Sequence, residues 1–305
     1  MLTAESRKRK ENTMKYRLTD KTILWKGHLL HRIQSIKDFG DVHEGDLGGF
    51  VENESNLSHD GNAWVYSDAW VYDDAQVWGD AQVSGNAKVY RNAKVWDNAW
   101  VCCNAEVCGN ATVYDKAWVG DNAQVYGDAE VYGNTWVCDN AKVYDNAKVF
   151  GNSKVYGNAT VYGNARIYDN AIIFDGAEVY DKVKVYGDAW VYGNTKVCGN
   201  AWVFDEAKVY GNARVFGNAK VYDNAKVHGN ARVCDKARAY GNAKVYGEAW
   251  VHGNARVFDE ALVYGNAQVF DEAEVCGEAE AYGNAWIYGN ARVDGNAGVC
   301  GDVHR

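Results

Sequence analysis

Residues 207–222 read AKVYGNARVFGNAKVY, and the six-residue phrase that they repeat continues without a slip from Ala63 to Ala297. The phrase typically has a small residue, then Asn, Asp or Glu, then Ala, a variable residue, Val and an aromatic residue. A short fixed period is typical of solenoid proteins, in which each unit stacks on copies of itself. The repeat therefore predicts an architecture more directly than an activity.

Alternation within Ala-x-Val-aromatic indicates a short β-strand, because successive side chains on a strand point to opposite faces. We expect Ala and Val to be buried and the variable and aromatic residues to face outward. The Gly-Asn and Asp-Asn pairs between strands tolerate positive φ and turn the chain sharply. Three such six-residue units close one coil of eighteen, which predicts an all-β parallel solenoid with three walls. Other residues replace Ala in four units: Thr135, Ser153, Val183 and Thr195.

This pattern resembles that of the hexapeptide-repeat left-handed parallel β-helix superfamily, whose units carry a small residue four positions after an aliphatic one. Val65 and Ala69 follow this rule, as do Val71 and Ala75 and nearly all later units. The left-handed winding is implied by the resemblance, since the period alone gives only the three walls. Pentapeptide-repeat solenoids are excluded by the six-residue step.

The chain divides into three parts: residues 1–14 as a disordered polar tail, 15–61 as a small N-terminal β cap and 62–305 as the β-helix. Alternating apolar residues on both sides of Lys26-Gly27 predict a β-hairpin in the cap. The cap also resembles that of bacterial and phage β-helix proteins of unassigned function, some described as polymer-forming, through FGDVHEGDLGGFV at 39–51. Met14 is an alternative start, and the basic run at 7–10 is expected to be a solvated tail.

Composition restricts the cellular location and the classes of partner that we expect. The net charge of −9 disfavours nucleic acid and anionic membranes as partners. No apolar run reaches the roughly 20 residues that span a bilayer, and the N-terminus lacks the apolar segment of a secretory signal. We therefore expect a cytoplasmic protein, or a phage product assembled in a cytoplasm. The absence of Pro fits a chain whose strands need their backbone N–H groups for pairing.

The eight cysteines are expected to be reduced thiols. Cys102 and Cys138 share a column of the repeat, as do Cys198 and Cys234, but the members of each pair are two coils apart. Two coils at about 4.8 Å each exceed the limit of about 7 Å between the Cα atoms of a disulfide. The spacings match no zinc pattern, so neither a metal nor a cofactor is predicted.

Catalysis finds little support in the repeat. The resemblance brings acyltransferases and carbonic anhydrases into consideration, and such acyltransferases need a catalytic His and usually a loop extruded from a coil. No loop interrupts the period between 63 and 303. His228 and His252 stand at aromatic positions on different walls, so they are interpreted as substitutes for Tyr. A degenerate acyltransferase is the third-ranked hypothesis.

Two outward surfaces are candidate binding sites. One wall carries an aromatic residue on eleven consecutive coils, flanked by Lys and Arg at variable positions such as Lys148, Arg166 and Lys184. This ladder could bind an extended glycan, or its rings could simply stack on one another and shield the backbone. The ladder residues are Trp78, Trp96, Tyr114, Tyr132, Phe150, Tyr168, Tyr186, Phe204, Tyr222, Tyr240 and Phe258.

The second surface is a tryptophan patch. Trp100, Trp118 and Trp136 occupy the variable position on three successive coils, beside the small residues Cys102, Gly120 and Cys138. We expect a flat indole strip over a shallow trough, which would bind a partner or a second copy. Size compensation between the two columns is the alternative.

The final VCGDVHR leaves a strand at Val303 without a separate cap, which favours axial association; the alternative is that His304 and Arg305 block this end. We expect self-association that is either axial or lateral. The leading hypothesis is a non-enzymatic structural or interaction protein, a rigid self-associating β-helical rod. A glycan-binding module is the alternative.

Overall fold

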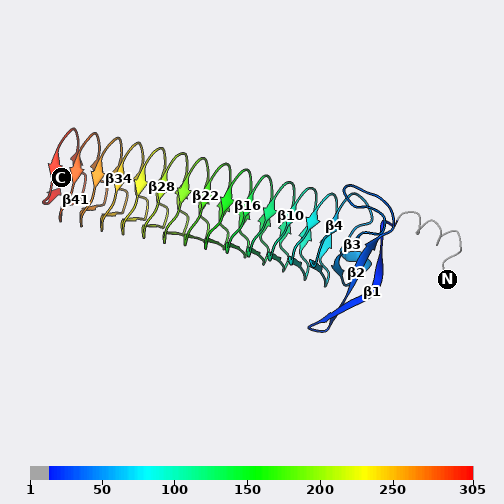
Figure 1. Ribbon diagram of the computed structural model, residues 1–305. Helices are drawn as coiled ribbons and strands as arrows, with labels where there is room; N and C mark the ends of the chain where they lie inside the picture. The colour runs from blue at the N-terminus through cyan, green and yellow to red at the C-terminus, as the bar shows by residue number, and fades with distance from the viewer. Residues whose placement is uncertain (1–13, 305) are drawn as a thin grey trace. The chain divides into compact units, whose positions relative to one another are not determined.

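The computed structural model describes residues 14–304 and divides into two compact units, one ending at Asp145 and the other beginning at Asn146. The polar tail, apart from Met14, and Arg305 lie outside the described residues. The repeat array in each unit is built from short parallel β-strands with corners between them (Figure 1). We call them unit 1 and unit 2.

Unit 1 opens with a β-hairpin. Strands β1 (Tyr16–Trp25) and β2 (His28–Ser35) pair antiparallel, with Trp25 opposite His28. The two turn residues, Lys26 and Gly27, have φ of 48° and 94°, a left-handed pair that suits a tight hairpin turn. The hairpin predicted at these residues is confirmed. Strand β3 (Leu47–Val51) then pairs antiparallel with β2, and a single 3-10 turn, η1 (Glu54–Asn56), follows.

The array in unit 1 forms three walls of two-residue strands, each pairing in parallel with the strand one coil away, as Trp70 does with Lys88. Wall A contains β5 (Trp70–Val71), β8 (Lys88–Val89), β11 (Glu106–Val107), β14 (Gln124–Val125) and β17 (Lys142–Val143). Wall B contains β4 (Trp64–Val65), β7 (Gln82–Val83), β10 (Trp100–Val101), β13 (Trp118–Val119) and β16 (Trp136–Val137). Wall C contains β6 (Gln76–Val77), β9 (Lys94–Val95), β12 (Thr112–Val113) and β15 (Glu130–Val131).

Unit 2 repeats this arrangement. Its walls A, B and C begin at β20 (Thr160–Val161), β19 (Lys154–Val155) and β18 (Lys148–Val149), and every third strand belongs to the same wall. Each later strand consists of the variable residue and the Val, Ile or Ala after it, up to β43 (Gly298–Val299), with β41 (Trp286–Tyr288) one residue longer. The predicted all-β parallel solenoid, with three walls and a coil that closes after eighteen positions, is confirmed.

The last strand departs from the period. By the six-residue count Val303 falls at an Ala position, but in β44 (Val303–His304) it pairs with Ile287, only sixteen residues earlier. His304 consequently stacks on Tyr288, with ring centroids 5.2 Å apart. The last strand is therefore shifted by two residues from the period, and Val303 lies opposite another β-branched residue.

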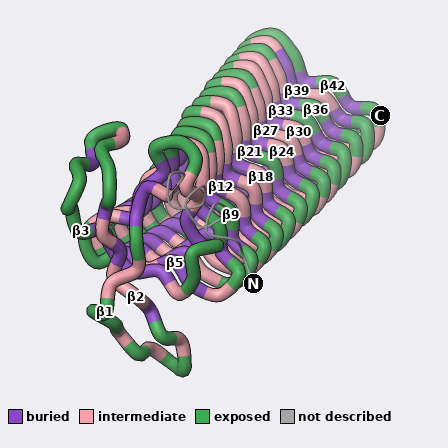
Figure 2. The backbone as a smooth tube through the Cα atoms, turned by 90° about the vertical axis from the view of Figure 1, so that its right-hand side faces the viewer, coloured by how far each residue is buried: buried purple, intermediate pink, exposed green. Residues whose placement is uncertain are grey.

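The core of the repeat array in each unit consists of the Ala and Val columns. From Ala63 to Ile287 both columns are almost completely shielded from solvent, and Figure 2 shows the buried residues recurring along every coil between exposed corners. The hydroxyls of Thr135 and Ser153 replace Ala and remain buried by donating to the carbonyls of Tyr132 and Phe150, at 3.1 and 2.9 Å. Burial of each Val contributes roughly 1.5–2 kcal/mol before chain entropy is counted.

The corners use positive φ, as predicted, at both Gly and Asp. Gly211 has φ of 75° and Asp223 has φ of 55°. The Asp side chain adds a second contact, because its Oδ2 accepts from the backbone N–H one coil further on, as in Asp223 with Gly241 at 3.0 Å. The neighbouring Asn side chains form amide ladders such as Asn194–Asn212–Asn230, with N···O distances of 3.4 and 3.0 Å. The corner Asn is thus a ladder residue as well as a turn residue.

Parallel pairing starts before the repeat does. Phe50 and Val51 of β3 pair with Trp70 and Val71, and Leu57 bridges to Val77, all at a spacing of twenty instead of eighteen. Part of the predicted cap therefore covers the first coil as an irregular coil of its own. Within residues 14–304 no helix is long and apolar enough to cross a membrane.

Candidate functional site

The tryptophan patch lies on wall B of unit 1. Trp100 pairs with Trp118, which pairs with Trp136, so the three indoles stand on adjacent strands of one sheet. Trp100 and Trp136 are 48% and 49% exposed, and Trp118 is half-buried. The Trp118 and Trp136 rings meet edge to face with centroids 5.2 Å apart. The structure thus brings the predicted patch together.

The expected trough beside these indoles is filled at Gly120. A Cβ placed on Gly120 would lie 2.7 Å from Cζ2 of Trp118, so the Trp118 ring occupies the space of the missing aromatic side chain. Its N–H donates to Sγ of Cys102 at 3.0 Å, and the N–H of Trp100 donates to Oγ of Ser84 at 2.9 Å. Size compensation between the columns therefore holds for Trp118, whereas Trp100 and Trp136 remain the exposed part of the surface.

Wall B of unit 1, all of which lies within the described residues, carries no charged side chain on its strands or at its aromatic positions. The strands β7, β10, β13 and β16 present one Gln and three Trp, beside Ser84, Cys102, Gly120 and Cys138. Walls A and C of the same unit carry charged residues in the equivalent columns, such as Lys88, Glu106 and Lys94. A hollow of about 450 Å³ adjoins the uncharged wall and is lined partly by Trp100, Gln82 and Asp41.

The aromatic ladder lies on wall C of both units. In unit 1 the rings from Trp78 to Tyr132 stack with centroids 4.4–4.9 Å apart and nearly parallel planes. In unit 2 the rings from Phe150 to Phe258 stack at 4.8–5.0 Å. Each ring therefore covers the faces of its neighbours and presents its edge to solvent. Stacking of a sugar on the ring faces would need these contacts to open.

Several cations beside the ladder already have partners in the chain. The ammonium groups of Lys184 and Lys220 lie 4.5 and 4.6 Å from the Trp202 ring, one on each neighbouring strand. Arg256 pairs with Glu274 at 2.7 Å. These contacts hold the side chains along the wall and reduce their availability to a polymer.

The two array histidines behave as aromatic residues. His228 stacks between Tyr210 and Tyr246 with centroids 4.7 and 5.0 Å apart, and His252 stacks on Phe270 at 4.9 Å. Burial lowers the pKa of both imidazoles, and Lys226 and Lys244 lower that of His228 further. The sequence interpretation of these histidines as substitutes for Tyr agrees with this geometry.

All eight cysteines are free thiols, as expected. Burial raises the pKa of Cys102 to about 12 and that of Cys234 to about 11, although each thiol accepts an indole N–H that opposes the shift. Both thiols are therefore poor nucleophiles at neutral pH.

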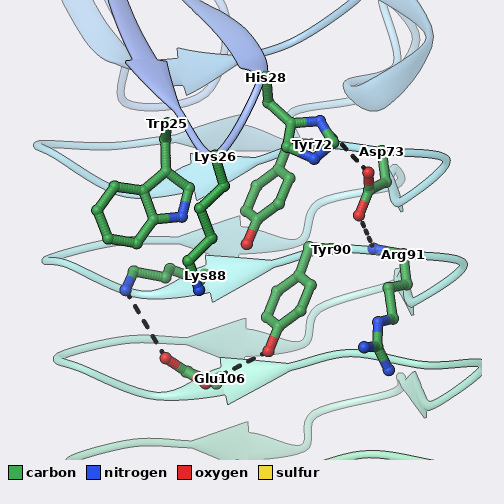
Figure 3. A pocket seen from close by; sticks show the side chains of 9 residues that line it. All are labelled: Trp25, Lys26, His28, Tyr72, Asp73, Lys88, Tyr90, Arg91 and Glu106. Atoms are coloured by element: carbon green, nitrogen blue, oxygen red, sulfur yellow. Dashed lines mark hydrogen bonds and ion pairs between the residues drawn. The ribbon is translucent and has the colours of Figure 1, made fainter.

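A third surface, not predicted from the sequence, lies where the hairpin meets the first coils of unit 1 (Figure 3). It is a hollow of about 330 Å³, a size within the range of small-molecule sites. The lining residues are Trp25, Lys26, His28, Tyr72, Asp73, Lys88, Tyr90, Arg91 and Glu106.

At the edge of this hollow His28 faces two carboxylates. Its Nδ1 lies 3.1 and 3.2 Å from the two oxygens of Glu52 and 3.4 Å from Oδ1 of Asp73. His28 lies in β2, Glu52 directly follows β3 and Asp73 lies in the corner after β5. Their sequence spacings match no metal motif. The only sequence signal for this surface was the composition of the hairpin turn, where Trp25, Lys26 and His28 cluster.

Five segments of the chain match a family model described as "YdcK Beta solenoid repeat", at residues 105–121, 123–139, 153–166, 207–223 and 285–301. Together they make up about a quarter of the chain and lie within the repeat array. The match supports the assignment to β-solenoid repeat proteins, and the resemblance to the hexapeptide-repeat superfamily stays a prediction. No curated protein matches the chain.

Proposed function

We propose that this chain is a non-enzymatic β-solenoid scaffold that associates with a second copy of itself through wall B of unit 1. The observation that carries the proposal is the uncharged wall with two half-exposed indoles, Trp100 and Trp136, in a chain of net charge −9. Like-charged chains repel each other, so a face without charges is where two copies can approach most closely.

The composition of the wall fits the centre of a protein–protein interface. Such centres are depleted in charged residues and enriched in aromatic ones, and Trp is prominent among residues whose truncation costs most binding energy. The hollow beside Trp100 offers space for a side chain of the facing copy.

The size of the wall limits the expected affinity. Four coils at about 4.8 Å extend about 19 Å, which gives less area than the roughly 800 Å² per partner of a stable interface. We therefore expect a reversible, concentration-dependent dimer rather than a permanent one.

The regular array supports a non-enzymatic role. Two-residue strands recur every six residues from β4 to β40 (Glu280–Ala281), which leaves the described coils without an inserted loop to shape an acceptor pocket. His228 and His252 are stacked in the array and their lowered pKa values reflect burial among rings. Glycan binding along the ladder gains less support, because the ring faces already contact one another.

Sedimentation velocity at several protein concentrations tests this proposal. The double variant W100K/W136K should shift the equilibrium to monomer, and its fold should be preserved because Lys occupies the same strand position in β9 and β17. The matched control is W286K, which removes a Trp of similar exposure (47%) from wall A of unit 2. The proposal fails if the double variant and the wild type sediment identically at every concentration.

A further inference from the structure

The cluster of His28, Glu52 and Asp73 carries an inference that does not depend on self-association. We propose that these three side chains bind a divalent transition-metal ion, for which Zn²⁺ is the best candidate, and that the bound ion fastens the β1–β2 hairpin to the first coil. The potential ligand atoms, one from each residue, all lie within 4.8 Å of one another.

Hydrogen bonding alone does not account for this convergence. The Nδ1 atom of His28 can carry one proton, but three carboxylate oxygens lie within 3.4 Å of it. One N–H serves one good acceptor, and the two carboxylates would repel each other. A divalent ion between the three groups would neutralise both carboxylates and use the lone pair of the neutral imidazole.

The distances agree with a small tetrahedral ion. Ligand atoms about 2.0–2.2 Å from Zn²⁺ lie about 3.3–3.6 Å from one another in a tetrahedron. The Nδ1 atom lies 3.1 Å from Oε1 of Glu52 and 3.4 Å from Oδ1 of Asp73, so small shifts would complete the geometry. One His and two carboxylates form a nitrogen and oxygen donor set that suits Zn²⁺ and leaves a fourth position for water.

Backbone amides hold both carboxylates in place. The N–H of Asp73 donates to Oε2 of Glu52 at 2.7 Å, and the N–H of Arg91 donates to Oδ2 of Asp73 at 3.0 Å. Each carboxylate therefore has one oxygen fixed by the main chain. Both carboxylates face Nδ1 of His28, Glu52 with both of its oxygens and Asp73 with Oδ1. Metal sites commonly show such outer-shell support, which orients the ligands before the ion arrives.

Arg91 and Lys88 do not take the place of a metal ion between the two carboxylates. Figure 3 shows the Arg91 guanidinium pointing away from the Asp73 carboxylate, although the Arg91 N–H contacts it. Lys88 pairs with Glu106 at 3.7 Å and lies over the Trp70 ring. The cluster is therefore negative whether His28 is neutral or protonated, and the three side chains remain partly open to solvent, with exposures of 23–30%.

Titration of the full chain with Co²⁺ and Zn²⁺, after dialysis against a chelator and under reducing conditions, tests the site. We expect one equivalent of Co²⁺ to give the visible spectrum of a tetrahedral site with nitrogen and oxygen ligands, and Zn²⁺ to displace it. His28→Ala should weaken binding at least 100-fold, more than the roughly 10–100-fold that loss of an outer-shell partner costs. Zn²⁺ should also slow hydrogen exchange in the β1–β2 hairpin.

The matched control is His43→Ala, because His43 also faces a carboxylate, Asp38 at 3.8 Å, and should leave Co²⁺ binding unchanged. Asp73→Asn keeps an acceptor for the Arg91 N–H but removes one charged ligand, so it tests the site even if His28→Ala disturbs the hairpin. The proposal is overturned if the wild type binds no Co²⁺, if either ligand variant binds as well as the wild type, or if a thiolate absorption band shows that cysteines hold the ion.

Discussion

The indole N–H of Trp118 donates to Sγ of Cys102, sixteen residues earlier and one coil back. The same relationship joins Trp250 to Cys234 at 3.1 Å and Trp100 to Ser84 at 2.9 Å. A large side chain at the variable position thus leans over the aromatic position of the preceding coil. Where that position carries Ser84, Cys102 or Cys234, the indole is anchored there by a hydrogen bond.

Gly120→Ala tests how tightly Trp118 is held. The new Cβ would lie 2.7 Å from the Trp118 ring, so the indole must move, and we expect a loss of about 1 kcal/mol. In a Trp118→Thr background the same change should be neutral or slightly stabilising, because Ala lowers the entropy of the unfolded chain. Equilibrium denaturation of the four proteins gives the coupling energy. Equal effects of Gly120→Ala in both backgrounds would show that the ring does not occupy this space.

The periodic part of the fold was predictable because each residue of the array has the same environment as its equivalents in the other six-residue units. Val191 and Ala189 are buried by the same alternation that buries every Val and Ala of the array, and Asp223 adopts positive φ at a corner like the Gly at other corners. The contacts between Trp118 and Cys102 were missed because they run diagonally between coils, at a spacing of sixteen rather than eighteen.

The candidate metal site was not predictable in the same way. His28 reaches Glu52 and Asp73 only because the hairpin folds against the first coil, and no repeat fixes that placement. The irregular coil that contains Phe50 was missed for a related reason, since its pairing with Trp70, at a spacing of twenty, falls outside the period.

Thr195 is expected to be a weak point in the core of unit 2. Its side chain is completely buried and its Oγ1 has no hydrogen-bond partner among the described residues, unlike Oγ1 of Thr135, which donates to the carbonyl of Tyr132. Thr195→Val should therefore stabilise unit 2 by about 1 kcal/mol, because it removes an unsatisfied hydroxyl and keeps the shape. Hydrogen exchange around β26 (Lys196–Val197) measures the local change. Thr135→Val is the matched control and should be neutral or destabilising; a larger gain there than at Thr195 would contradict the assignment.

The corner residue Asp223 combines positive φ with a hydrogen bond to the next coil. Asp223→Ala should cost about 2 kcal/mol, because Ala keeps the unfavourable φ of 55° and loses the acceptor for the Gly241 N–H. Asp223→Gly should cost less, since Gly adopts this φ without strain. Asp223→Asn should be close to neutral, because its carbonyl oxygen can still accept. Hydrogen exchange of the Gly241 amide reports the lost hydrogen bond directly. The loss of stability should decrease in the order Ala, Gly, Asn.

Lys15 makes the stability of the cap depend on pH. Its side chain is only 1% exposed, its Nζ donates to the carbonyl of Gly61 at 3.1 Å, and burial lowers its pKa from 10.5 to about 8, against the opposing pull of Asp60 and Asp80. Between these two pKa values the unfolded chain binds more protons at Lys15 than the folded chain does, so stability rises with pH. Below about pH 8 the ammonium is charged in both states and the cost of burying it is constant.

The variant Lys15→Met removes this titration and isolates it from the other groups that ionise at alkaline pH. From pH 7 to about 8 the difference in stability between the two proteins should stay constant. From about pH 8 to 10.5 the wild type should gain on the variant, because its buried amine is then neutral when folded. Hydrogen exchange of the cap at several pH values, corrected for intrinsic rates, measures this difference. Lys21→Met, at an exposed position of β1, is the matched control for the loss of one lysine from the cap. A flat difference for Lys15→Met up to pH 10 would show that its amine is not desolvated.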